Sequence, residues 1–236
     1  MAFMIFNVQT TSLKQLIADE IKRRILYGEL EFGQKISENS FAQELETKRT
    51  PVREAFILLQ GENLVSIVPQ KGTFVFTFTE EEISQMCDFR YVLEAASLDA
   101  LQKRGEREHF ITEMTNTLQE LKKAFEEDDM LTCEKHDAKF HEQIINYSGN
   151  KFLISSYTSI ADRVNAIRYR SVVTKERFLS LYTQHEKILK YFCDGNIKQC
   201  KAALEQHLHI TLNRVLNDPV MYERILQKKF PGKAKA

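Results

Sequence analysis

From residue 79 to residue 218, apolar side chains recur every three or four positions almost without interruption. This is the spacing of helices that bury one face. The pattern breaks at five short segments: Gly105, Asp128-Asp129, Ser148-Gly149, Thr174 and Gly195. The breaks predict six long helices, at 80–103, 106–127, 129–147, 150–172, 175–194 and 196–216. Because short loops join the long helices of antiparallel bundles, we expect an all-α antiparallel bundle here.

The first 78 residues have a different pattern of apolar and polar side chains. Three short helices are predicted, from Ser12 to Tyr27, from Ser37 onward, and from about Thr50 to Gly61. After Asn63 the apolar period changes from 3.6 to 2, which predicts strands at 64–68 and 73–78 joined by a turn. This order of elements is that of a winged helix-turn-helix. We therefore expect a mainly α protein with two domains, 1–78 and 79–236.

The composition excludes several classes of protein. The chain has 236 residues, of which 28% are charged and 43% hydrophobic, as in soluble globular proteins. No stretch approaches the roughly 18 to 20 apolar residues of a membrane span. Lys+Arg and Asp+Glu both number 33, which excludes a polybasic tail protein but not a local basic patch. The four cysteines lack CxxC spacing, so we expect free thiols, a cytoplasmic location and no membrane association.

The second helix of a helix-turn-helix lies in the DNA major groove and contacts bases through its N-terminal residues. Arg49 and Arg53 are four positions apart and so project from one face of that helix. Arginine can contact guanine through two hydrogen bonds, and Thr50 can contact a thymine methyl group or a phosphate. With the start of the preceding helix and the wing turn, the predicted DNA-contacting residues are Ser37, Asn39, Lys48, Arg49, Thr50, Arg53, Lys71 and Gly72.

The ordinary alternative is that these basic residues form a solvated helix face. Residues 1–79 contain nine Lys+Arg and nine Asp+Glu, so the segment lacks the basic excess of a strong nucleic-acid binder. Contact with phosphates would then depend on basic side chains that cluster on one side.

A possible metal site lies in the helical half. Asp137 and His141 have i, i+4 spacing on a predicted helix, so both side chains project from one face. His185 and His207 lie on two other predicted helices. One aspartate and three histidines make a donor set that suits Zn, Ni, Mn, Co or Fe and can leave coordination positions open. The ordinary alternative is a surface Asp–His pair and two buried histidines, and spacing alone does not decide between them.

Short motifs in the first domain carry a family resemblance. They are Ile21-x-x-x-Ile25-Leu26-x-Gly28-x-Leu30, Gly33-x-x-Ile36-Ser37-Glu38, Arg49-Thr50-Pro51-Val52-Arg53-Glu54-Ala55 and Lys71-Gly72-x-x-Val75. This set resembles the DNA-binding domain of GntR-family bacterial transcription regulators. The resemblance implies that Arg49, Thr50 and Arg53 contact DNA and that Lys71 and Gly72 lie at the wing. Phe32 replaces the usual proline, and Asn39 replaces an arginine of some relatives, so the recognised DNA sequence does not transfer.

The helical half carries its own motifs. They are Arg90-x-x-x-Glu94, Asp137-x-x-x-His141, Ser148-Gly149-Asn150, His185-x-x-Ile188 and Ala202-x-x-x-x-His207. This set resembles the FCD effector domain of the FadR subfamily, and six helices suggest its VanR-like branch. The resemblance implies one divalent metal per chain, bound by Asp137, His141, His185 and His207. Zn or Ni is the first choice, with Mn, Co or Fe as alternatives.

The resemblance also implies an effector site beside the metal. Arg90 is expected to clamp an effector carboxylate, because arginine binds carboxylates through two hydrogen bonds. The ordinary alternative for Arg90 is an i, i+4 salt bridge with Glu94. Arg163 could serve the same purpose from the fourth helix, as could Arg168 and Arg170. Asn150 is a further effector candidate, with helix capping as its alternative.

These observations predict a ligand-responsive bacterial transcription regulator, expected to be a repressor and not an enzyme. It would bind a pseudo-palindromic double-stranded DNA operator as a homodimer and respond to a small organic acid. One alternative is a regulator that senses the metal directly. A second is a metal-dependent hydrolase, because an open site could activate water. The absence of a His-Glu-x-x-His motif counts against the hydrolase.

Overall fold

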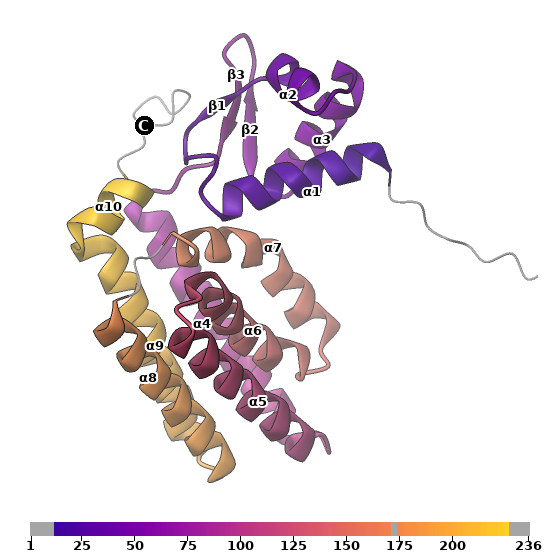
Figure 1. Ribbon diagram of the computed structural model, residues 1–236. Helices are drawn as coiled ribbons and strands as arrows, with labels where there is room; N and C mark the ends of the chain where they lie inside the picture. Colours follow the sequence, from indigo (N-terminus) through magenta and orange to yellow (C-terminus); the bar gives the residue numbers. More distant parts are fainter. Residues whose placement is uncertain (1–11, 171–173, 227–236) are drawn as a thin grey trace, which may run out of the picture. The chain divides into compact units, whose positions relative to one another are not determined.

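The chain divides where the β-hairpin ends and the long helices begin. The computed structural model describes residues 12–170 and 174–226. Within these ranges, residues 12–76 form one unit and residues 77–226 form a second. The first unit combines three helices with a small sheet, and the second is helical throughout (Figure 1). This confirms the mainly α fold class.

The first unit contains the three expected helices. They are α1 (Leu13–Leu26), α2 (Glu38–Glu44) and α3 (Arg49–Gly61). The core between α1 and α3 consists of side chains at helical spacing, among them Ile21 and Ile25 of α1 and Val52 and Phe56 of α3, all at most 1% exposed. Because these side chains face inward, the opposite face of α3 is left for solvent.

The sheet of the first unit has three antiparallel strands in the order β1-β3-β2. The predicted hairpin is β2 (Val65–Val68) and β3 (Gly72–Val75), with Val65 opposite Val75. The third strand, β1 (Lys35–Ile36), was not expected, and it pairs with β3 through Lys35 and Phe74. A strand of two residues has no period that a sequence could reveal.

The second unit contains the six expected long helices and one short one. They are α4 (Glu80–Gln102), α5 (Arg107–Glu126), α6 (Met130–Asn146), α7 (Lys151–Arg168), α8 (Lys175–Cys193), α9 (Ile197–Asn217) and α10 (Pro219–Ile225). Most ends lie within one or two residues of the predicted ones. Helix α7 is shorter than predicted: it ends at Arg168, with Tyr169 as its C-cap, and not at residue 172, which lies outside the described residues.

Local signals explain where these helices begin. Thr79 accepts a hydrogen bond from the Glu82 backbone N–H, and the Glu82 carboxylate accepts one from Thr79 N. This reciprocal pair is a capping box, which satisfies two donors that the helix itself cannot. Asn150, Thr174 and Asn196 cap α7, α8 and α9, each accepting from a backbone N–H of the first turn through its side-chain oxygen.

The packing of the second unit surrounds a polar centre with an apolar core. The closest packing is between α5 and α6, between α8 and α9, and between α4 and α9. Phe110, Phe140 and Phe192 are at most 1% exposed. Buried charged and imidazole side chains of α4, α6, α7, α8 and α9 lie inside the same unit. Across residues 12–170 and 174–226, no helix has the length and apolar character required to span a bilayer.

Candidate functional site

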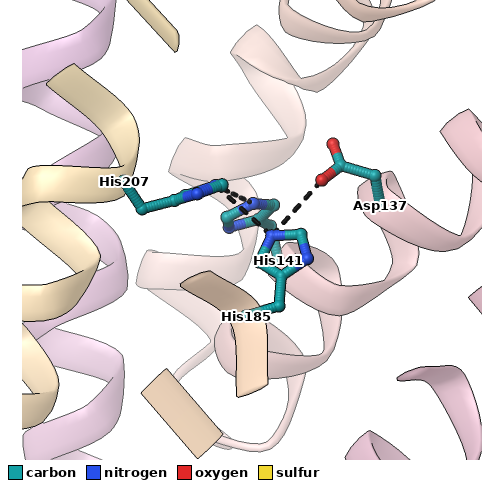
Figure 2. Close-up of side chains that lie close together, drawn as sticks. All are labelled: Asp137, His141, His185 and His207. Atoms are coloured by element: carbon teal, nitrogen blue, oxygen red, sulfur yellow. Dashed lines mark hydrogen bonds and ion pairs between the residues drawn. The ribbon is translucent and has the colours of Figure 1, made fainter. Parts of the chain in front are cut away.

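Three helices bring together the four predicted metal-binding side chains. Asp137 and His141 lie one turn apart on α6, His185 lies on α8, and His207 lies on α9 (Figure 2). All four are buried, with exposures between 0% and 5%. One donor atom from each lies within 4.8 Å of the donors of the others. The i, i+4 pair therefore faces the bundle interior, and the two distant histidines meet it there.

The three imidazole rings point the same nitrogen toward one centre. His207 Nε2 lies 3.2 Å from His141 Nε2 and 3.3 Å from His185 Nε2. Asp137 Oδ1 lies 3.3 Å from His185 Nε2. Zn–N bonds of about 2.0 to 2.1 Å in tetrahedral geometry separate neighbouring donors by about 3.3 Å. The observed spacing therefore fits a bound first-row metal ion.

The outer nitrogens of two rings are held by hydrogen-bond acceptors. His141 Nδ1 lies 2.7 Å from Glu94 Oε2, and His207 Nδ1 lies 3.0 Å from Gln184 Oε1. Gln184 donates its amide N–H to Ser180, which orients its oxygen toward His207. Because these oxygens accept, Nδ1 of each ring carries the proton and Nε2 presents a lone pair. Lone pairs at 3.2 Å repel one another, and a cation between them would remove that repulsion.

The electrostatic environment keeps the histidines neutral. Burial lowers the pKa of His141 and His207 well below the ordinary value and lowers the pKa of His185 to about 4. The guanidinium groups of Arg90 and Arg168 lower these values further. Neutral imidazole is the form that binds metals. The three imidazole rings are therefore in the neutral form that can bind a cation at physiological pH.

Asp137 is ionised for a different reason. Burial by itself would raise the pKa of its carboxyl group, but the charges around it, that of the Arg168 guanidinium above all, outweigh burial and lower it. Arg168 Nε lies 2.6 Å from Asp137 Oδ2, while Oδ1 has no hydrogen-bond partner among the described residues. The salt bridge therefore fixes the carboxylate and leaves one buried oxygen for a further ligand.

A pocket rich in arginine borders two of the four donors, Asp137 and His207. Its lining includes Asp137, His207, Glu134 and the arginines Arg90, Arg168, Arg177 and Arg214, and we call it the arginine pocket. Two of the four guanidinium groups already have carboxylate partners outside the pocket lining, Arg90 with Glu94 and Arg177 with Asp218. Burial and the Asp137 charge raise the pKa of the Glu134 carboxyl well above its usual value, which reduces its negative charge. The guanidinium groups therefore still outnumber the ionised carboxylates, which suits an anionic ligand.

Of the three predicted effector residues, the structure places one in the arginine pocket. Arg90 lines the arginine pocket and also forms the expected ion pair, with Nε 2.7 Å from Glu94 Oε1. Asn150 caps α7, accepting from Phe152 N, and the Arg163 guanidinium lies 4.8 Å from the centre of the Phe78 ring. Within the described residues, neither Asn150 nor Arg163 lines the arginine pocket. Their placement favours capping for Asn150 and ring packing for Arg163.

Sequence reasoning missed two arginines of this pocket. Arg177 lies in the first turn of α8 and Arg214 lies in the last turn of α9, and no motif in the sequence connects either of them with Asp137. Only the packing of α8 against α9 brings them to Asp137. Arg168 was considered as an alternative to Arg163, and it is the member of that pair that reaches the site.

Seven of the eight predicted DNA-contacting residues are exposed. They are Ser37, Asn39, Lys48, Arg49, Thr50, Arg53 and Lys71. The side chains of Arg49 and Arg53 are 60% and 58% exposed and project from the solvent face of α3. Gly72 is half-buried with φ +110°, and a Cβ atom there would lie 2.9 Å from Lys35 Cε. The wing thus uses a conformation that favours glycine.

Glu38 of α2 was not among the predicted DNA-contacting residues. Its carboxylate forms ion pairs with both Arg49 and Arg53. Its two carboxylate oxygens lie 2.9 Å from Arg53 Nε and Nη2, and Arg49 Nη2 lies 3.5 Å away. The Arg53 guanidinium lowers the pKa of the Glu38 carboxyl, which therefore stays ionised. The arginine side chains are thus oriented before any ligand arrives.

A winged helix-turn-helix with exposed arginines, followed by a helical unit, is the architecture of a DNA-binding transcription regulator. Residues 13–75 match the family described as bacterial regulatory proteins, gntR family, and residues 85–210 match the FCD domain. The FCD match alone spans more than half of the chain. The chain belongs to the GntR family of bacterial transcription regulators and carries an FCD domain.

Named relatives agree with this assignment. The gluconate operon transcriptional repressor of Bacillus licheniformis is 27% identical over 173 residues, covering 73% of this chain and 70% of the relative. LutR, an HTH-type transcriptional regulator of Bacillus subtilis, is 29% identical over 204 residues, covering 77% and 91%. A GntR transcriptional regulator from Rhodococcus sp. RHA1 has the same fold, with a TM-score of 0.75, 20% identity, and coverage of 88% and 99%. These are regulators rather than enzymes.

Proposed function

We propose that this regulator is a repressor that binds a pseudo-palindromic operator as a homodimer and releases it in response to a small organic acid. Its helical unit would hold one divalent metal through Asp137, His141, His185 and His207. The observation that carries the proposal is the convergence of four buried donor atoms, two of them from rings whose Nδ1 atoms face the acceptors Glu94 and Gln184. Relatives named as repressors support the direction of control.

The donor set favours Zn or Ni, with Mn, Co or Fe as alternatives. When bound, the metal would act as a Lewis acid that attracts a carboxylate to an open coordination position. The chain's own residues would do the rest. Arg168 would keep Asp137 ionised, and Glu94 and Gln184 would keep the imidazole rings oriented.

The arginine pocket supports an organic acid as the effector. Its four guanidinium groups lie beside two of the proposed metal ligands, Asp137 and His207. A carboxylate there could contact the metal and the guanidinium groups together. An effector changes DNA binding only if it binds one conformation of the protein better than the other. We infer that the effector favours a helical arrangement in which the two recognition helices of the dimer no longer fit adjacent half-sites.

The test begins with selection of a binding sequence from random duplexes by the full-length protein. Fluorescence anisotropy would then measure affinity for the selected duplex with metal-free protein, with zinc-loaded protein, and with zinc plus a panel of mono- and dicarboxylates. We expect at least one carboxylate to weaken binding fivefold or more. If zinc alone changes affinity and no carboxylate does, the protein senses the metal directly. If neither has an effect, the proposed sensing mechanism is wrong.

Arg53→Ala tests the assignment of the DNA interface. Loss of a base-contacting arginine should cost about 1 to 3 kcal/mol in binding to the selected duplex. Arg23→Ala is the matched control, because Arg23 lies on α1 and forms exposed ion pairs with Glu20 and Glu29. Its loss should leave DNA affinity nearly unchanged. Equal affinities of both variants and the natural protein would contradict the placement of α3 in the major groove.

A further inference from the structure

A second space, lined mainly by apolar side chains, adjoins the arginine pocket. It lies among α4, α7 and α9, and we call it the apolar recess. Its apolar walls include Ile83, Met86, Val164, Ile167, Leu208 and Leu212. It shares three lining residues with the arginine pocket, namely Arg90, Arg168 and Thr211. The two spaces therefore meet at a pair of guanidinium groups.

Both shared arginines have a nitrogen without a partner. Arg90 uses Nε on Glu94, and Arg168 uses Nε on Asp137 and Nη1 on Asn165. The Arg168 guanidinium also interacts with the Tyr157 hydroxyl group. The Nη2 atoms of both are buried and have no hydrogen-bond partner in the described part of the chain. Both side chains are only 6% exposed. A buried donor without a partner is costly, so these two nitrogens point to an acceptor that a ligand supplies.

The polar groups are distributed unevenly around these two nitrogens. On one side lie the proposed metal ligands Asp137 and His207, with Arg177 and Arg214. On the other side the walls are aliphatic apart from Cys87 and Thr211, and the Thr211 hydroxyl already donates to His207 O at 3.2 Å. A ligand whose carboxylate contacts Arg90 and Arg168 would therefore place its remaining atoms among hydrocarbon side chains.

We propose that the effector is a carboxylate with a short hydrocarbon chain, and that this chain occupies the apolar recess. The inference rests on the proposed function, since it names the chemical class of that effector. Each methylene that leaves water for an apolar wall contributes binding free energy. A polyhydroxylated acid would instead bury hydroxyl groups that find few partners there. The effector class would thus differ from gluconate, the acid in the names of two relatives.

Isothermal titration calorimetry on zinc-loaded full-length protein would test this with acetate, butyrate, hexanoate and gluconate. Hexanoate and gluconate both have six carbons, so they differ in hydroxylation rather than length. We expect affinity to rise about fourfold for each methylene that becomes buried. Hexanoate should bind at least tenfold more tightly than gluconate.

Met86→Asn would place an uncharged polar group at the half-buried edge of the recess, with Met86→Leu as its matched control. The asparagine should reduce hexanoate affinity at least tenfold and leave acetate affinity within about twofold, because it adds no carboxylate that could pair with Arg90. The leucine variant should retain the preference for hexanoate. Circular dichroism and zinc content would verify that both variants fold and hold metal, and Cys87→Asn at the same wall gives a second test if Met86→Asn does not fold.

The outcomes separate this inference from the proposed function. If gluconate binds as tightly as hexanoate, or if acetate and hexanoate bind equally, the recess does not hold the effector chain and the inference is wrong. The carboxylate effector itself would survive that result. If none of the four acids binds zinc-loaded protein while zinc binding persists, the effector part of the proposed function fails, and this inference fails with it.

Discussion

Glu94 is a fully buried carboxylate that connects two parts of the site. Oε1 accepts from Arg90 Nε, and Oε2 lies 2.7 Å from His141 Nδ1. Burial raises the pKa of the Glu94 carboxyl group, and the Arg90 guanidinium opposes that shift. Arginine cannot release its proton, so an ionised Glu94 is the partner that balances it. Glu94 therefore selects the His141 tautomer whose Nε2 is free for a metal.

Glu94→Gln should weaken zinc binding. An amide N–H placed against His141 Nδ1 would favour the opposite tautomer, with a proton on Nε2. Loss of such an orienting carboxylate typically costs 10-fold to 100-fold in metal affinity. Chelator competition measures the affinity, and nitrogen-15 chemical shifts of the imidazole rings in metal-free protein report the tautomer. Glu81→Gln, at an exposed position of α4, is the control. An unchanged tautomer and affinity would contradict this role for Glu94.

The three histidines predict an unusual pH dependence of metal binding. Protons compete with metal for imidazole only below the pKa of each ring. Because burial lowers these pKa values, to about 4 for His185, the neutral form persists as pH falls through 6.5 and is lost as pH approaches 4. Zinc affinity, corrected for protonation of the competing chelator, should change little between pH 7.5 and 5.5. A loss of tenfold or more between pH 7 and 6 would show ordinary histidine pKa values instead.

At the scale of elements, local signals account for what the sequence could predict. Most helices of the second unit begin at side chains that cap them, such as Thr79 and Asn196, and each of these signals lies within a few residues of the helix start. Strand β1 depends on pairing between Lys35 and Phe74, which are far apart in the chain. The interaction of Glu38 with Arg53 also joins two elements, and no periodicity predicts it.

Thr79→Ala tests the capping signal at the start of α4. It removes the hydroxyl that accepts from Glu82 N, so we expect the free energy of unfolding to fall by about 1 kcal/mol. Urea denaturation followed by circular dichroism measures this change. Thr112→Ala is the matched control, because Thr112 is an exposed residue inside α5, where alanine is the better helix former. Equal stabilities of the two variants would mean that the cap contributes nothing.

At the scale of the whole molecule, the site depends on tertiary packing, and only some of its residues can be predicted from the sequence. The i, i+4 spacing identified Asp137 and His141, and His185 and His207 were candidates on two other predicted helices. The family resemblance then favoured all four as one set. The chain has no net charge, yet four arginines line the arginine pocket. Such a local separation of charge cannot be read from composition, because Arg177 and Arg214 join the site only through the packing of α8 on α9.

The central claim is that four buried side chains hold one divalent metal per chain. Elemental analysis of untagged protein, purified without chelator or added metal, tests it most directly. We predict about one equivalent of zinc or nickel in the natural protein and none in His185→Ala, while His209→Ala, an exposed histidine on α9, retains the metal. Absence of metal from the natural protein, even after incubation with zinc, nickel and manganese, would contradict the account.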